Sequence, residues 1–170
     1  MNREDAFAIL DELDAPAHLK KHVDLVGEAA EALLKTMHAL QVDINSDFVA
    51  AGVVIHDIGK IVHTEEMARP GSEHETTGQG ILLNRGVSAE YARVCMSHAR
   101  WETMVCTLEE LIIALSDKLW KGKREAALEL MVIDRVAENL GKDRWDIYSD
   151  LDSAFENIAS AGHERLQRSK

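Results

Sequence analysis

The sequence is poor in proline and in segments that favour strands or turns. Only two of its 170 residues are proline, whereas alanine, leucine, glutamate and lysine, which favour helices, are frequent. With 46% hydrophobic and 29% charged residues, the composition argues against a disordered chain. We therefore predict a globular domain of the all-α class.

Cysteine, positive charge and long apolar runs are also scarce. Cys95 and Cys106 form neither a CxxC pair nor a disulfide framework, so a reducing cytoplasm is the simplest setting. The formal net charge of −11 argues against broad binding to nucleic acid or to an anionic membrane, and we expect neither partner. No apolar run approaches the ~20 residues of a spanning helix. The opening residues, MNREDAF, lack a signal-peptide pattern.

Residues 1–170 contain no internal repeat or linker-like segment, which predicts one domain. Capping boxes at Ser72/Glu75 and Thr107/Glu110 each predict the start of a helix. Gly59 is a plausible C′ residue at the end of another helix. The helices we expect cover residues 4–13, 17–40, 47–58, 72–85, 88–98, 107–120, 123–140 and 144–161, with a loop over 61–71.

Several ionisable residues fall on apolar faces of the predicted helices. At about 100° per residue, five helices each direct at least one such group inward: His22, the pair His56 and Asp57, His74, His98, and Asp117. A single buried histidine or aspartate is more often a core residue with a local hydrogen bond. Burying all six without partners would cost several kcal/mol for each group. A divalent metal accepts imidazole and carboxylate ligands from separate helices, so the set predicts a metal site.

The order of these residues carries a family resemblance. The motif HDIG at residues 56–59, with His22 before it and Asp117 in the setting SDKL after it, resembles the HD-domain superfamily of metal-dependent phosphohydrolases. The resemblance is strongest over residues 16–120, and residues 121–170 would be C-terminal helices of the same domain. It implies a helical bundle with a central metal site.

The resemblance also implies which residues bind metal. His22, His56, Asp57 and Asp117 would bind a first divalent ion, while His74 and His98 match the extra histidines of dinuclear members. Asp57 would then bridge two ions. Their identity stays open among Fe, Mn, Co, Ni and Zn, since all accept these ligands in varying degree.

The implied reaction is hydrolysis of a phosphate ester or anhydride in a nucleotide-like small molecule by a metal-bound hydroxide. Asp57 and Lys60 are the candidate catalytic residues, and Lys60 could contact either the phosphate or a ligand carboxylate. Further candidates for phosphate contact are Arg69, Arg100 and Lys118, although an ordinary solvated charge explains each of these three equally well.

Departures from family patterns narrow the activity. The sequence has no GYP signature of cyclic di-GMP phosphodiesterases and no HDxxED pattern of guanosine-tetraphosphate hydrolases. The layout is more similar to the small HD hydrolases that cleave dinucleoside polyphosphates. One alternative is an HD-domain oxygenase, whose mixed-valence di-iron centre uses the same six ligands to cleave C–C or C–P bonds. Another is a non-catalytic signalling or binding module, against which the intact ligand set argues.

Overall fold

The computed structural model describes residues 1–170 and is all-α, as predicted, with ten α-helices, two 3-10 helices and no strand. None of the helices combines the length and the apolar character needed to cross a membrane. The elements are α1 (Arg3–Glu12), α2 (Ala17–Ala39), α3 (Ser46–Ile55), η1 (Ile58–Ile61), η2 (Thr64–Met67), α4 (Glu73–Asn84), α5 (Ala89–Ala92), α6 (Val94–Arg100), α7 (Leu108–Leu119), α8 (Ala126–Leu140), α9 (Arg144–Ser160) and α10 (Gly162–Arg168).

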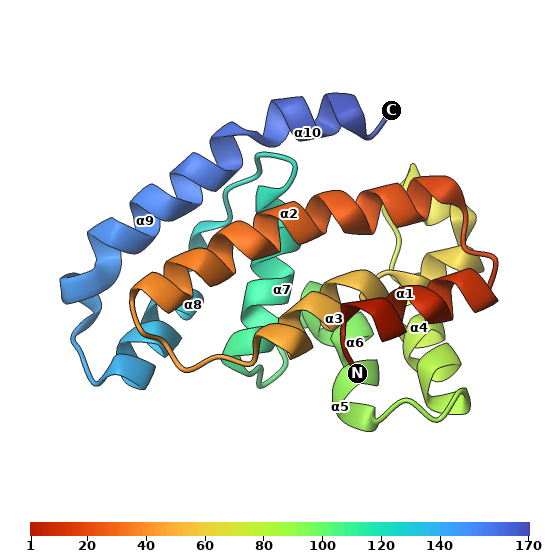
Figure 1. The fold of residues 1–170 in the computed structure, drawn as a ribbon, viewed down its shortest axis with the longest axis horizontal. Helices are drawn as coiled ribbons and strands as arrows, with labels where there is room; N and C mark the ends of the chain where they lie inside the picture. The colour runs from red at the N-terminus through yellow and green to blue at the C-terminus, as the bar shows by residue number, and fades with distance from the viewer.

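The long helix α2 extends across the molecule, and α3, α7 and α9 pack against it (Figure 1). Its buried face repeats every three or four residues, which is the period of an amphipathic helix. The apolar residues on this face are all buried: Leu19, Val23, Val26, Ala30, Leu33 and Met37. The helix therefore buries one continuous face along its length.

Two hydrophobic clusters meet along α2 and α3. The larger cluster joins these helices to α7, α8 and α9, and the smaller one joins them to α1, α4 and α5. Val23 of α2 and Val54 of α3 belong to the smaller cluster. Leu25 of α2 and Val53 of α3 belong to the larger one. Because the apolar core is divided in this way, a buried polar residue on α2 or α3 can lie between the two clusters and need not lie inside either of them.

Gly59 does not end a helix in the way that we predicted. Helix α3 already ends at Ile55, and Gly59 lies inside η1 without the positive φ of a C′ glycine. A Cβ atom at Gly59 would lie 1.9 Å from the carbonyl oxygen of His74 and 2.8 Å from the nitrogen of Gly78. Glycine is needed because the backbones of η1 and α4 touch here.

The predicted capping box at Ser72 and Glu75 is also wrong. The Ser72 side chain caps nothing, and the Glu75 carboxylate is buried against Arg100. Glu66 caps α4 instead. This residue lies in η2, within the segment that we predicted as a loop. Its carboxylate accepts hydrogen bonds from the backbone nitrogens of Glu73, at 3.1 Å, and His74, at 3.3 Å. The second capping box, at the start of α7, is confirmed.

Two further differences concern helix boundaries. The single helix predicted over residues 88–98 is divided at Arg93 into α5 and α6. Helix α10 follows α9 directly and was not predicted. It is held by charged side chains: Arg168 binds Glu28 of α2 at 2.7 and 2.6 Å, and the buried Arg165 donates to the carbonyl oxygen of Ile158 at 2.8 Å.

Candidate metal centre

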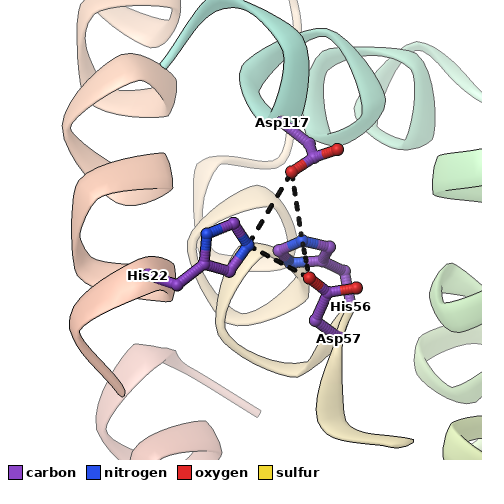
Figure 2. Close-up of side chains that lie close together, drawn as sticks. All are labelled: His22, His56, Asp57 and Asp117. Carbon is purple, nitrogen blue, oxygen red and sulfur yellow. Dashed lines mark ion pairs between the residues drawn. The ribbon is translucent and has the colours of Figure 1, made fainter. Parts of the chain in front are cut away.

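Four predicted ligands from three helices converge on one point (Figure 2). His22 projects from α2, His56 and Asp57 stand just after the last residue of α3, and Asp117 projects from α7. Their ligand atoms all lie within 4.8 Å of one another. The Nε2 atom of His22 is 3.0 Å from Asp57 Oδ2 and 3.8 Å from Asp117 Oδ1. The corresponding distances from His56 Nε2 are 3.3 and 3.6 Å.

The other two predicted ligands lie on the opposite oxygen of Asp57. Its Oδ1 atom is 3.3 Å from Nε2 of His74, on α4, and 3.5 Å from Nε2 of His98, on α6. One carboxylate thus directs one oxygen to His22 and His56 and the other oxygen to His74 and His98. Each oxygen of this carboxylate therefore faces its own pair of imidazoles, so Asp57 could contribute a ligand atom on each side.

The atoms at the centre lack hydrogen-bond partners. Nε2 of His22, His56 and His74 and Oδ1 of Asp57 are all buried, and none makes a hydrogen bond. Buried polar atoms without partners are costly and rare in folded proteins. A divalent metal ion would satisfy them together, since imidazole nitrogen and carboxylate oxygen are ordinary ligands of first-row transition metals. The residues present therefore fit a metal centre.

The imidazoles are oriented by their second nitrogen atoms. His56 Nδ1 lies 2.7 Å from the carbonyl oxygen of Val53, and His98 Nδ1 lies 3.1 Å from that of Val94. A carbonyl oxygen only accepts, so each Nδ1 carries a proton and each Nε2 atom faces the centre, where it can offer a lone pair to a metal once it is deprotonated.

His74 is oriented by a carboxylate that the sequence did not reveal. Its Nδ1 atom is hydrogen-bonded to Glu66, the residue that also caps α4. Such carboxylate–histidine pairs are common behind metal ligands. Glu66 lies in a segment without apolar periodicity, eight residues before His74, so no sequence signal connected the two.

The charges at the centre change the protonation of its residues. Burial would lower the pKa of His56, but the neighbouring carboxylates of Asp57 and Asp117 outweigh burial and raise this pKa to about 10. Burial and the positive charge of His56 lower the pKa of His98 to about 4. Burial would raise the pKa of Asp57, but the adjacent imidazoles of His56 and His22 hold it well below its usual value. Without a bound metal ion, the proton on His56 therefore balances part of the negative charge of Asp57 and Asp117.

Lys60 contacts a ligand carboxylate, one of the two contacts expected for it. Its Nζ atom lies 2.6 Å from Asp57 Oδ2, and its side chain is largely buried. This places a fixed positive charge beside the residue that links the two groups of ligands. Lys60 therefore holds the Asp57 carboxylate in position.

The centre opens into two clefts with volumes of about 700 and 440 Å³. The larger one is partly apolar, with Met67, Trp120 and Leu166 among its lining residues. Arg69 and Lys118, two of the predicted phosphate contacts, line the smaller cleft. The third, Arg100, is not among the lining residues of either cleft, and its guanidinium binds Glu75.

Comparison with known proteins agrees with this geometry. The family model described as HD domain matches residues 18–121, which is more than half of the chain and includes all six candidate ligands. Among curated proteins and solved structures, none matches the chain. On the family match, the chain belongs to the HD-domain family.

Proposed function

We propose that the protein is a metal-dependent phosphohydrolase that cleaves an ester or anhydride bond in a nucleotide-like small molecule. HD domains are commonly metal-dependent hydrolases. The observation that carries the proposal is the buried Asp57 carboxylate, whose two oxygens face two separate pairs of imidazoles. This arrangement suits a pair of metal ions, which in hydrolytic sites supports displacement at phosphorus.

The residues of the centre would have different roles in this reaction. The ions would be held by His22, His56, Asp57, His74, His98 and Asp117. When bound, they would lower the pKa of a coordinated water and polarise a phosphoryl oxygen. Lys60 keeps Asp57 in place, and Glu66 orients His74. The positive charges of Arg69 and Lys118 line the cleft where phosphate oxygens would lie.

Hydrolysis can be tested with p-nitrophenyl phosphate, bis(p-nitrophenyl) phosphate and a panel of nucleotides. Protein loaded with Mn, Fe, Co, Ni or Zn should release nitrophenol or phosphate with at least one metal. A chelator should abolish the activity, and Asp57→Ala should lower it by at least about 1,000-fold because it removes the shared ligand.

Asp150→Ala is the matched control, because Asp150 is exposed and forms no ion pair or side-chain hydrogen bond, and this variant should keep full activity. Full activity in Asp57→Ala would contradict the proposal. So would the absence of hydrolysis with every metal, and oxygen consumption by the iron-loaded protein would then support the oxygenase alternative.

A further inference from the structure

The smaller cleft gathers positive charge in a protein of net charge −11. The basic residues that line it are Lys60, Arg69, Lys118, Lys121 and Lys123, and the acidic ones are Asp57, Glu66, Glu75 and Asp117. Which of these charges already have partners decides what the cleft can still bind.

Every acidic residue of the cleft is already engaged. Asp57 and Asp117 face the imidazoles of the metal centre. Glu66 binds His74 and caps α4, and Glu75 binds Arg100. No carboxylate remains to neutralise an additional positive charge.

The basic residues are not all engaged. Lys60 lies 2.6 Å from Asp57, Lys118 lies 3.6 Å from Asp117, and Lys123 lies 3.5 Å from Glu125.

Arg69 and Lys121, in contrast, form no ion pair and no side-chain hydrogen bond, although both line the cleft. Arg69 precedes α4, and Lys121 follows α7. Lys121 also lines the larger cleft, so it stands where the two clefts meet. Both residues are exposed and can be reached by a ligand.

Metal ions would increase this excess of positive charge. The two carboxylates Asp57 and Asp117 can neutralise one divalent ion at most, and Lys60 already shares one of them. Unpaired cations around such a centre repel it and one another within a Debye length of about 8 Å. An anion with several charges, extending from the metal centre toward Arg69 and Lys121, would relieve this repulsion.

We infer that the substrate carries a second anionic group next to the phosphoryl group that is cleaved, and that Arg69 and Lys121 bind it. The inference rests on the proposed function and specifies its substrate class: a diphosphate-like anion rather than a simple monophosphate ester. The planar guanidinium of Arg69 can bind two oxygens of such a group, and the ammonium of Lys121 supplies a point charge. Neither residue has a role in holding the metals.

Calorimetric titration with inorganic phosphate and inorganic pyrophosphate tests the inference without relying on turnover. The metal-loaded protein, freed of unbound metal, is compared with a double variant carrying Arg69→Met and Lys121→Met. The matched control is Lys142→Met, since Lys142 is an exposed lysine that lines neither cleft and forms no ion pair. Elemental analysis checks that all three proteins contain the same amount of metal.

The wild-type protein should bind pyrophosphate at least about 10-fold more tightly than phosphate. The double variant should lose most of this preference, because its affinity for pyrophosphate should fall far more than its affinity for phosphate. The double variant is needed because the metals alone could also make pyrophosphate bind more tightly than phosphate. Only a loss of the preference in this variant assigns it to Arg69 and Lys121. The control should behave as the wild type.

Three results would overturn the inference: no preference for pyrophosphate in the wild type, an unchanged preference in the double variant, or loss of metal from that variant. If the metal-loaded wild type bound neither anion, the proposed function itself would fail. Failure of the proposal and failure of the inference are therefore distinguishable.

Discussion

At the scale of single residues, the chemistry of the protein converges on Asp57. Its carboxylate is buried, forms an ion pair with Lys60 and faces four imidazoles. The negative charge of this carboxylate can be balanced in two ways: by protons on the imidazoles, or by metal ions bound between the carboxylate and the imidazoles. The two states compete, so acidity and metal affinity are linked.

Metal uptake should release protons. The pKa of His56, raised from 6.5 to about 10 in the metal-free protein, means that its proton stabilises the folded state at low pH and that this contribution is lost as the pH rises toward 10. A coordinated imidazole is neutral, so the metal must displace this proton. Apparent metal affinity should therefore rise between pH 6 and 8, by up to about tenfold per pH unit for each proton displaced.

Calorimetry in buffers of different ionisation enthalpy measures this release directly. We expect the observed binding enthalpy at pH 7 to change with the buffer, in the direction of proton release. Identical enthalpies in all buffers would show that the histidines are already neutral before the metal binds.

Glu66 should control the part of the centre that contains His74. Substitution Glu66→Gln removes the negative charge behind the imidazole and weakens the cap of α4. Changes of this kind commonly lower metal affinity or activity by 10- to 100-fold. We expect metal titration to show one weakened site and one that is nearly unchanged.

The adjacent Glu65→Gln is the matched control, because the Glu65 side chain is 61% exposed and makes only a long contact, 3.7 Å, with His63. Equal metal affinity in the two variants would contradict the role that we assign to Glu66.

At the scale of helices, the sequence was informative wherever an apolar stripe existed. Their apolar residues located α2 and α7 to within a few residues, and the six candidate ligands were visible because each interrupts or borders an apolar face. The capping box of α7 added a reliable start signal.

The segment from η1 to the start of α4 could not be predicted in the same way. Its path depends on contacts between backbones, such as Gly59 against Gly78, and on the cap that Glu66 supplies from η2. Helix α10 was also missed, because it is only seven residues long and is anchored by Arg165 and Arg168 rather than by an apolar stripe.

The contact between η1 and α4 should tolerate no side chain at Gly59. In Gly59→Ala the new methyl group would overlap backbone atoms of His74 and Gly78, which cannot move independently of α4. We expect a loss of at least about 1–3 kcal/mol in the free energy of unfolding, measured by denaturant titration. Metal affinity should fall as well, because His74 would shift.

Gly80→Ala tests the specificity of this effect. Gly80 lies on the same helix, α4, but a Cβ there would meet nothing within 4 Å. Because alanine favours helices, this variant should gain up to about 1 kcal/mol. A similar loss of stability in both variants would mean that close packing at Gly59 is not the cause.

At the scale of the whole molecule, the candidate centre connects elements that are far apart in the chain. Residues at or next to α2, α3, α4, α6 and α7 meet at this centre. Bound metal should therefore stabilise the fold as a whole, by about 2.7 kcal/mol when the free metal is at 100 times its dissociation constant.

The most direct test of this account is the number of metal ions bound by each chain, measured by elemental analysis after reconstitution and removal of unbound metal. We predict two ions in the wild type, one in His98→Ala, and fewer than one in Asp57→Ala, with circular dichroism confirming that each variant remains helical. A wild-type protein that binds no metal, or an Asp57→Ala variant that still binds two ions, would contradict a centre built around Asp57.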